Sequence, residues 1–145
     1  MINVLTILNW FTTKKAYLAP YADDESAKKA ATKLWTSVDK GDFIPFLTML
    51  ALAIIICWMY YFPFNKQAGR HYHPKYWAIF FVITLLAVLG LSFALLNFAI
   101  AKNASFDVWF LVKCSLMNTL YAAFVYLITS AIINRTGKSN AYPFI

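Results

Sequence analysis

The stretch that decides the fold is Asp107–Asn134, DVWFLVKCSLMNTLYAAFVYLITSAIIN, which is long and apolar enough to cross a membrane as a helix. Its polar side chains recur at the spacing that places residues on one side of a helix. This polar side consists of Ser115, Asn118, Thr119, Tyr126, Thr129 and Ser130. Because hydrocarbon offers no hydrogen bonds, we expect this side either to contact other helices or to line a water-filled pore.

Lys113 is the only charged residue inside this predicted span, six residues after Asp107. At about 1.5 Å per residue it lies roughly 9 Å along the helix, close enough to an end for its amine to reach the headgroups. It points well away from the polar side. We therefore interpret Lys113 as an interface anchor rather than as a gating or substrate-binding residue.

Two plainer apolar runs precede this stretch, at residues 43–62 and 76–100, and neither contains a charge. Each is long enough to cross a bilayer. Aromatic residues gather where the first run ends and the second begins, and amphipathic rings prefer the headgroup level. The expected interface anchors here are Trp58, Tyr60, Tyr76 and Trp77.

Small residues follow one side of the second predicted span, where helix backbones can approach closely. The expected close-packing residues are Ala87, Gly90, Ala94 and Asn97. The pattern predicts a contact side without identifying which helix covers it.

The N-terminal region combines two different segments. Met1–Phe11 is apolar but too short to span, so it either lies at the membrane surface or docks on the protein's own helices. After the acidic residues 23–25, a helix is expected to end at Gly41, with an apolar side opposite its lysines. The apolar side comprises Ala27, Ala30, Ala31, Leu34, Trp35 and Val38.

The sequence thus predicts an all-α polytopic membrane protein with an N-terminal segment (1–42), a three-helix transmembrane domain (43–134) and a C-terminal tail (135–145). The composition agrees, because 61% of residues are hydrophobic and only 13% are charged. The net charge of +7 comes from lysines and arginines that flank the apolar runs. This placement favours contact with the lipid bilayer and its anionic headgroups over nucleic-acid binding.

Catalysis finds little support, because the sequence contains no carboxylate pair, Ser-His-Asp set, phosphate-binding glycine loop or HExxH motif. His71 and His73 are the only histidines and have no carboxylate nearby in their predicted loop, so we expect no metal site and no cofactor. Cys57 and Cys114 fall inside predicted spans and lack the spacing of a zinc site.

Three classes of function remain. The first is a non-catalytic membrane subunit that forms homo-oligomers or joins other membrane subunits and anchors a larger membrane or envelope assembly. The second is a homo-oligomeric pore, holin-like or a defence effector, lined by the polar side of the third span. The third is a small-molecule membrane enzyme or lipid-binding protein built from hydroxyls and aromatics. We favour the first, because a row of interhelical hydrogen bonds, each about 0.6 kcal/mol, explains the polar side without a water path.

A bacterial inner membrane suits the compact loops and the missing signal peptide. The basic residues on the two sides of the predicted spans are nearly equal in number, so charge alone does not fix the orientation. A charged N-terminal segment stays more easily on the side of synthesis, which favours a cytoplasmic N-terminus.

Overall fold

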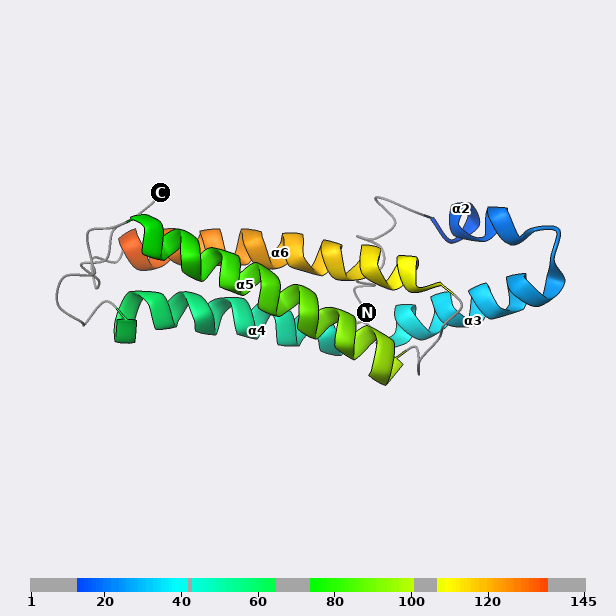
Figure 1. Ribbon diagram of the computed structural model, residues 1–145, viewed down its shortest axis with the longest axis horizontal. Helices are drawn as coiled ribbons and strands as arrows, with labels where there is room; N and C mark the ends of the chain where they lie inside the picture. The colour runs from blue at the N-terminus through cyan, green and yellow to red at the C-terminus, as the bar shows by residue number, and fades with distance from the viewer. Residues whose placement is uncertain (1–12, 42, 65–73, 101–106, 136–145) are drawn as a thin grey trace.

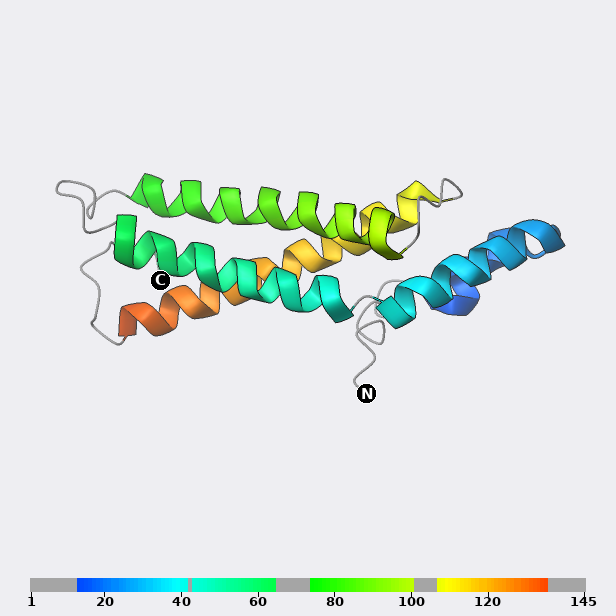
Figure 2. The same ribbon diagram turned by 90° about the horizontal axis from the view of Figure 1, so that it is seen from below.

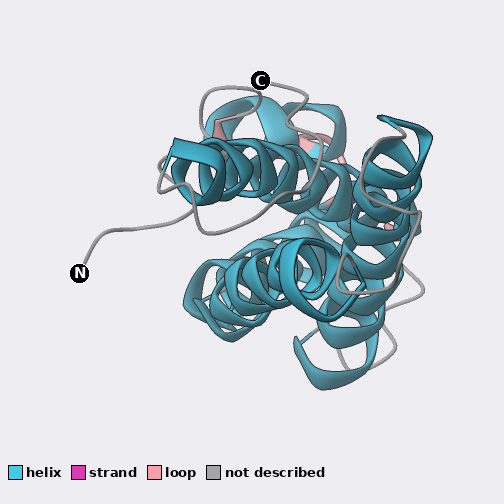
Figure 3. Cartoon of the chain, turned by 90° about the vertical axis from the view of Figure 1, so that its left-hand side faces the viewer, coloured by secondary structure: helices cyan, strands magenta, loops and turns pink. Residues whose placement is uncertain are grey.

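The computed structural model describes residues 13–41, 43–64, 74–100 and 107–135, and within these ranges every regular element is helical (Figures 1 and 3). Three helices are long and apolar enough to cross a membrane: Phe43–Phe64, Pro74–Phe98 and Val108–Arg135. They confirm the predicted all-α fold with three spans after shorter N-terminal helices. The expected interfacial segment Met1–Phe11 and the tail beyond Arg135 lie outside the described residues.

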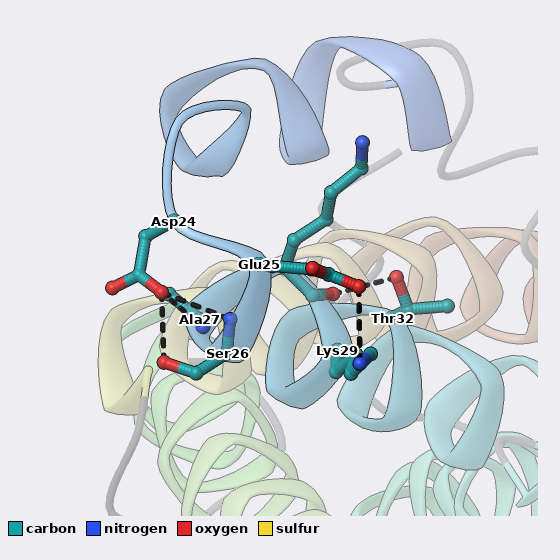
Figure 4. Close-up of polar contacts among 7 residues, drawn as sticks. Asp24, Glu25, Ser26, Ala27, Lys29 and Thr32 are labelled. Atoms are coloured by element: carbon teal, nitrogen blue, oxygen red, sulfur yellow. Dashed lines mark hydrogen bonds and ion pairs between the residues drawn. The ribbon is translucent and has the colours of Figure 1, made fainter.

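The N-terminal part, residues 13–41, forms an arm of α2 (Lys14–Leu18), η1 (Ala19–Tyr21) and α3 (Glu25–Gly41). Asp24 caps α3, because its Oδ1 accepts hydrogen bonds from Ser26 N at 2.9 Å and Ala27 N at 3.1 Å (Figure 4). The predicted apolar side is turned inward. Its fully buried members are Ala31, Leu34, Trp35 and Val38.

The first span combines α4 (Phe43–Met59) with a π-helical turn, η2 (Tyr60–Phe64). The sequence predicts an end at Phe62, yet the helix continues through Pro63 to Phe64. Proline lacks the N–H that an α-helix requires. The wider π turn accommodates the ring, so the span gains two residues.

The second span consists of α5 (Pro74–Ala94) and a second π-helical segment, η3 (Leu95–Ile100). The third span is α6 (Val108–Arg135). Asp107 caps α6, because its Oδ1 accepts a hydrogen bond from Phe110 N at 2.9 Å. The helices α4, α5 and α6 all contact one another, and the views in Figures 1 and 2 show them side by side.

The core of the molecule follows its long axis in three clusters. Where the arm joins the bundle, Leu34, Trp35 and Val38 pack against residues of η3 and α6. The middle cluster is small, with Met49, Ala53, Val88 and Ala122. The far cluster is aromatic, with Cys57, Tyr60, Tyr61, Trp77 and Tyr126.

The outer surface of the bundle is apolar. Ile44 on α4, Leu86 on α5 and Phe124 on α6 are 68%, 64% and 62% exposed. Such a surface suits lipid better than water. The three spans therefore fit an integral membrane protein.

The arm continues beyond the end of the bundle. Figures 1 and 2 both show α3 leaving the start of α4 along the long axis, with α2 folded back beside it. The arm therefore extends past the end of the bundle at which α4 begins, instead of folding across that end.

Candidate functional site

The polar side of α6 faces α4 and α5 within the same chain. Ser115, Asn118, Tyr126 and Ser130 are between 0% and 3% exposed. Thr119 and Thr129 are half-buried at the edge of this side. The four buried side chains are covered by the described part of the chain, whereas the choice between helix contact and pore lining stays a prediction for Thr119 and Thr129.

Asn118 makes the central polar contact between two spans. Its Nδ2 donates a hydrogen bond to Ser92 Oγ on α5 at 2.8 Å, and both side chains are buried. Ser115 and Thr119 instead donate to the carbonyl groups of Leu111 and Ser115 on their own helix, each at 2.9 Å. Asn118 is therefore the member of this middle group that joins helices.

Ser130 joins all three spans at the far end. Its hydroxyl forms a hydrogen bond with the Tyr61 hydroxyl on η2 and accepts one from Trp77 Nε1 on α5 at 3.1 Å. The rings of Trp77 and Tyr126 meet edge to face with their centroids 5.6 Å apart. The hydroxyl of Tyr126 has no hydrogen-bond partner among the described residues.

The small residues of α5 lie on the opposite side from its internal contacts. Within the chain α5 buries Trp77, Thr84, Val88 and Ser92. Gly90 is exposed, and a Cβ built on it would meet nothing within 4 Å outside its own helix. Its predicted companions, Ala87, Ala94 and Asn97, are half-buried. Of these four residues Gly90 is the exposed one, and their role in helix contact stays a prediction.

The predicted interface anchors take different positions. Trp58 is 51% exposed and Lys113 is also exposed, so both are free to reach the headgroups. Tyr76 is half-buried. Tyr60 and Trp77 lie inside the bundle, at 0% and 5% exposure. Their place at the headgroup level stays a prediction, and in the structure their rings pack in the bundle interior.

The arm and α6 also meet at a contact that the sequence does not predict. The ring of Tyr17 packs against those of both Trp35 and Phe110, with centroids 5.4 Å and 4.5 Å away. Tyr21 donates a long hydrogen bond of 3.4 Å to Asp107 Oδ2. Burial and the nearby Asp107 carboxylate raise the pKa values of both tyrosines. No local pattern predicts this contact, because Tyr21 and Asp107 are 86 residues apart.

The described residues show no group of three or more His, Cys, Asp or Glu side chains that could hold a metal ion. Cys57 and Cys114 are buried thiols in different core clusters. His71 and His73 lie outside the described residues. Comparisons with protein-family models, with curated proteins and with solved structures find no match.

Proposed function

We propose that the protein is a non-catalytic integral membrane subunit that associates with further copies or with other membrane subunits and anchors a larger assembly. The observation that carries this proposal is the division of α5 into two sides. Ser92 and Val88 face the chain's own helices, whereas Gly90 opens onto the lipid side with no atom near its absent Cβ.

Small residues on a lipid-facing side favour contact with another helix. Lipid tails are as apolar as side chains, so helices in a membrane associate by close contact and hydrogen bonding. Gly90, with Ala87 and Ala94 beside it, lets a second backbone approach closely. Asn97 adds a half-buried amide near the end of the same side, and an amide near hydrocarbon favours a partner that can hydrogen-bond to it.

The burial of the α6 polar side supports an anchoring subunit over a homo-oligomeric pore. Asn118 and Ser130 already hydrogen-bond to Ser92, Tyr61 and Trp77. To line a shared lumen, α6 would have to turn and break these contacts. The apolar outer surface is what a protein held in lipid by three spans requires.

The arm supplies the attachment point in this proposal. It is fixed to the bundle by the Trp35–Phe110 contact, with ring centroids 5.5 Å apart, and extends beyond it. We place the protein in a bacterial inner membrane with the arm and the N-terminus in the cytoplasm.

Gly90→Leu tests the proposal, because a Cβ at this position would meet nothing within 4 Å outside its own helix, and we expect the protomer to keep its fold. Wild-type protein in mild detergent should form a defined homo-oligomer or recover a stoichiometric partner, as measured by light scattering after size exclusion. We expect Gly90→Leu to weaken that association at least about tenfold, since it blocks close helix approach.

Ala51→Leu is the matched control, because Ala51 is also an exposed small residue, on α4. It should leave the association unchanged. A wild-type protein that is strictly monomeric and without a partner would contradict the proposed function. Ion or dye release from liposomes by the wild-type protein would favour the pore.

A further inference from the structure

The outward side of α3 carries a concentrated positive charge. Lys29, Lys33 and Lys40 lie directly opposite the buried residues of the helix, and Lys28 lies at the margin. These four lysines, with Glu25 and three hydroxyl residues, line a hollow of about 650 Å³, and all the described residues around it belong to α3. The lining contains four lysines against one glutamate, so its net charge is +3.

Glu25 offsets only a small part of this charge. Its Oε1 lies 3.1 Å from Lys29 Nζ, but both side chains are more than three-quarters exposed, at 82% and 76% (Figure 4). An ion pair this exposed is screened and weak. Asp24 is engaged by the start of the helix, where it accepts hydrogen bonds from Ser26 and Ala27. The lysines therefore remain available to an outside anion.

The chain itself cannot cover this surface with negative charge. Its six acidic residues are Asp23, Asp24, Glu25, Asp39, Asp42 and Asp107. Outside the described ranges the only acidic residue is Asp42, so the remaining segments carry no acidic run. A second copy offers only the run at residues 23–25, in which Asp24 already caps α3 and Glu25 already pairs with Lys29. Charge complementarity thus points to a different molecule.

The negative charge could come from anionic lipid headgroups or from another protein, and the direction of α3 distinguishes the two. The apolar surface begins at Phe43 and Ile44, which are 57% and 68% exposed, and α3 leads away from it along the long axis. At about 1.5 Å per residue, Lys33 and Lys29 lie roughly 15 and 21 Å from Phe43. The field of anionic headgroups decays over about 8 Å in physiological salt, so only Lys40 is close to it.

We infer that the outward side of α3 binds an acidic segment of a water-soluble protein, with Lys29, Lys33 and Lys40 contacting its carboxylates. This inference rests on the proposed function, because it names the chemistry of the partner that the anchored arm holds. The hydroxyls of Thr36 and Ser37 lie between the lysines along the helix and add hydrogen-bonding groups to the same surface.

The test uses full-length protein in nanodiscs of uncharged phosphatidylcholine, titrated with a fluorescent poly-L-glutamate peptide and followed by anisotropy. We expect salt-dependent binding that becomes about tenfold weaker in Lys29→Gln/Lys33→Gln/Lys40→Gln. The control Lys14→Gln/Lys15→Gln/Lys75→Gln removes the same number of exposed charges elsewhere and should change the affinity less than about twofold. Glu25→Gln should tighten binding about twofold, because it removes the competing carboxylate.

Three results would overturn the inference. The first is an affinity for the peptide in the α3 triple variant that equals that of the wild type. The second is an equal loss of affinity in both triple variants, which would reflect net charge alone. The third is α3-dependent retention of phosphatidylglycerol in mixed nanodiscs without binding of poly-L-glutamate, which would assign the surface to lipid. None of these results would change the effect of Gly90→Leu on association, so the proposed function would stand. Conversely, a wild-type protein that is monomeric but binds the peptide would contradict the proposed association and leave the inference about α3 intact.

Discussion

At the scale of single residues, Asn118 and Ser92 join two spans by one buried hydrogen bond of 2.8 Å. Asn118→Leu keeps a side chain of similar size and leaves Ser92 without its donor. Interhelical hydrogen bonds in membranes average about 0.6 kcal/mol and reach about 1.7 kcal/mol. We expect the variant to lose about 0.5–1.5 kcal/mol of unfolding free energy, measured by denaturant titration in micelles.

A double-mutant cycle with Ser92→Ala isolates this hydrogen bond. The loss of unfolding free energy in the double variant should be smaller than the sum of the losses in the two single variants. The reason is that the second substitution removes a group that the first has already left unpaired. Thr119→Val is the control one residue away, since the Thr119 hydroxyl donates to Ser115 O on its own helix. Strict additivity of Asn118→Leu and Ser92→Ala would show that the contact contributes nothing.

The inward position of Asn118 and Ser130 could be predicted, but their partners could not. Polar residues repeating at helical spacing in an apolar run identify one side of a helix. Ser92 is a lone serine in a segment that is apolar all round, so nothing in its neighbourhood distinguishes it. The partners of Tyr60 and Trp77 could not be predicted either. The aromatic-belt rule places such rings near the headgroups, but it does not say whether they face lipid or the bundle interior.

At the scale of elements, the start of α3 depends on the ionised carboxylate of Asp24. Hydrogen bonds from Ser26 and Ala27 lower the pKa of Asp24 below its usual value. The cap is therefore complete above the usual pKa of about 3.9 and is lost as the pH falls through the lowered value. We expect amide protection at Ser26, Ala27 and Lys28 to persist at pH 5 and to fall in stronger acid.

Asp24→Ala should lower that protection about threefold or more at neutral pH, measured by hydrogen exchange in micelles. Asp24→Asn is the control, because asparagine also caps helices and does not titrate there. Equal protection in Asp24→Ala and the wild type would show that the arm holds α3 through its buried side alone.

The side of α5 that faces its own chain could not be read from the sequence. Small residues predicted a contact side through Gly90, but Trp77, Thr84, Val88 and Ser92 make the internal contacts. A helix without polar periodicity has no preferred side until its neighbours are present. In α3, by contrast, lysines and apolar residues separate clearly around the helix, and its buried side agrees with the prediction.

At the scale of the whole molecule, three spans place the two ends of the described chain on opposite sides of the membrane. The arm extends from one end of the bundle, and Arg135 closes α6 at the other (Figure 1). The native thiols Cys57 and Cys114 are 0% and 2% exposed, so they need not be removed before labelling new cysteines.

Lys29→Cys and Arg135→Cys, both at exposed positions, therefore report the orientation directly. With a cytoplasmic arm, a membrane-impermeant maleimide should label Arg135→Cys in intact cells and Lys29→Cys only after the membrane is opened. Labelling of both from the same side would contradict three spans. The reverse pattern would keep the spans but move the arm to the exported side, and the acidic partner of α3 would then have to be an exported protein, because an electrostatic contact requires both surfaces in one compartment.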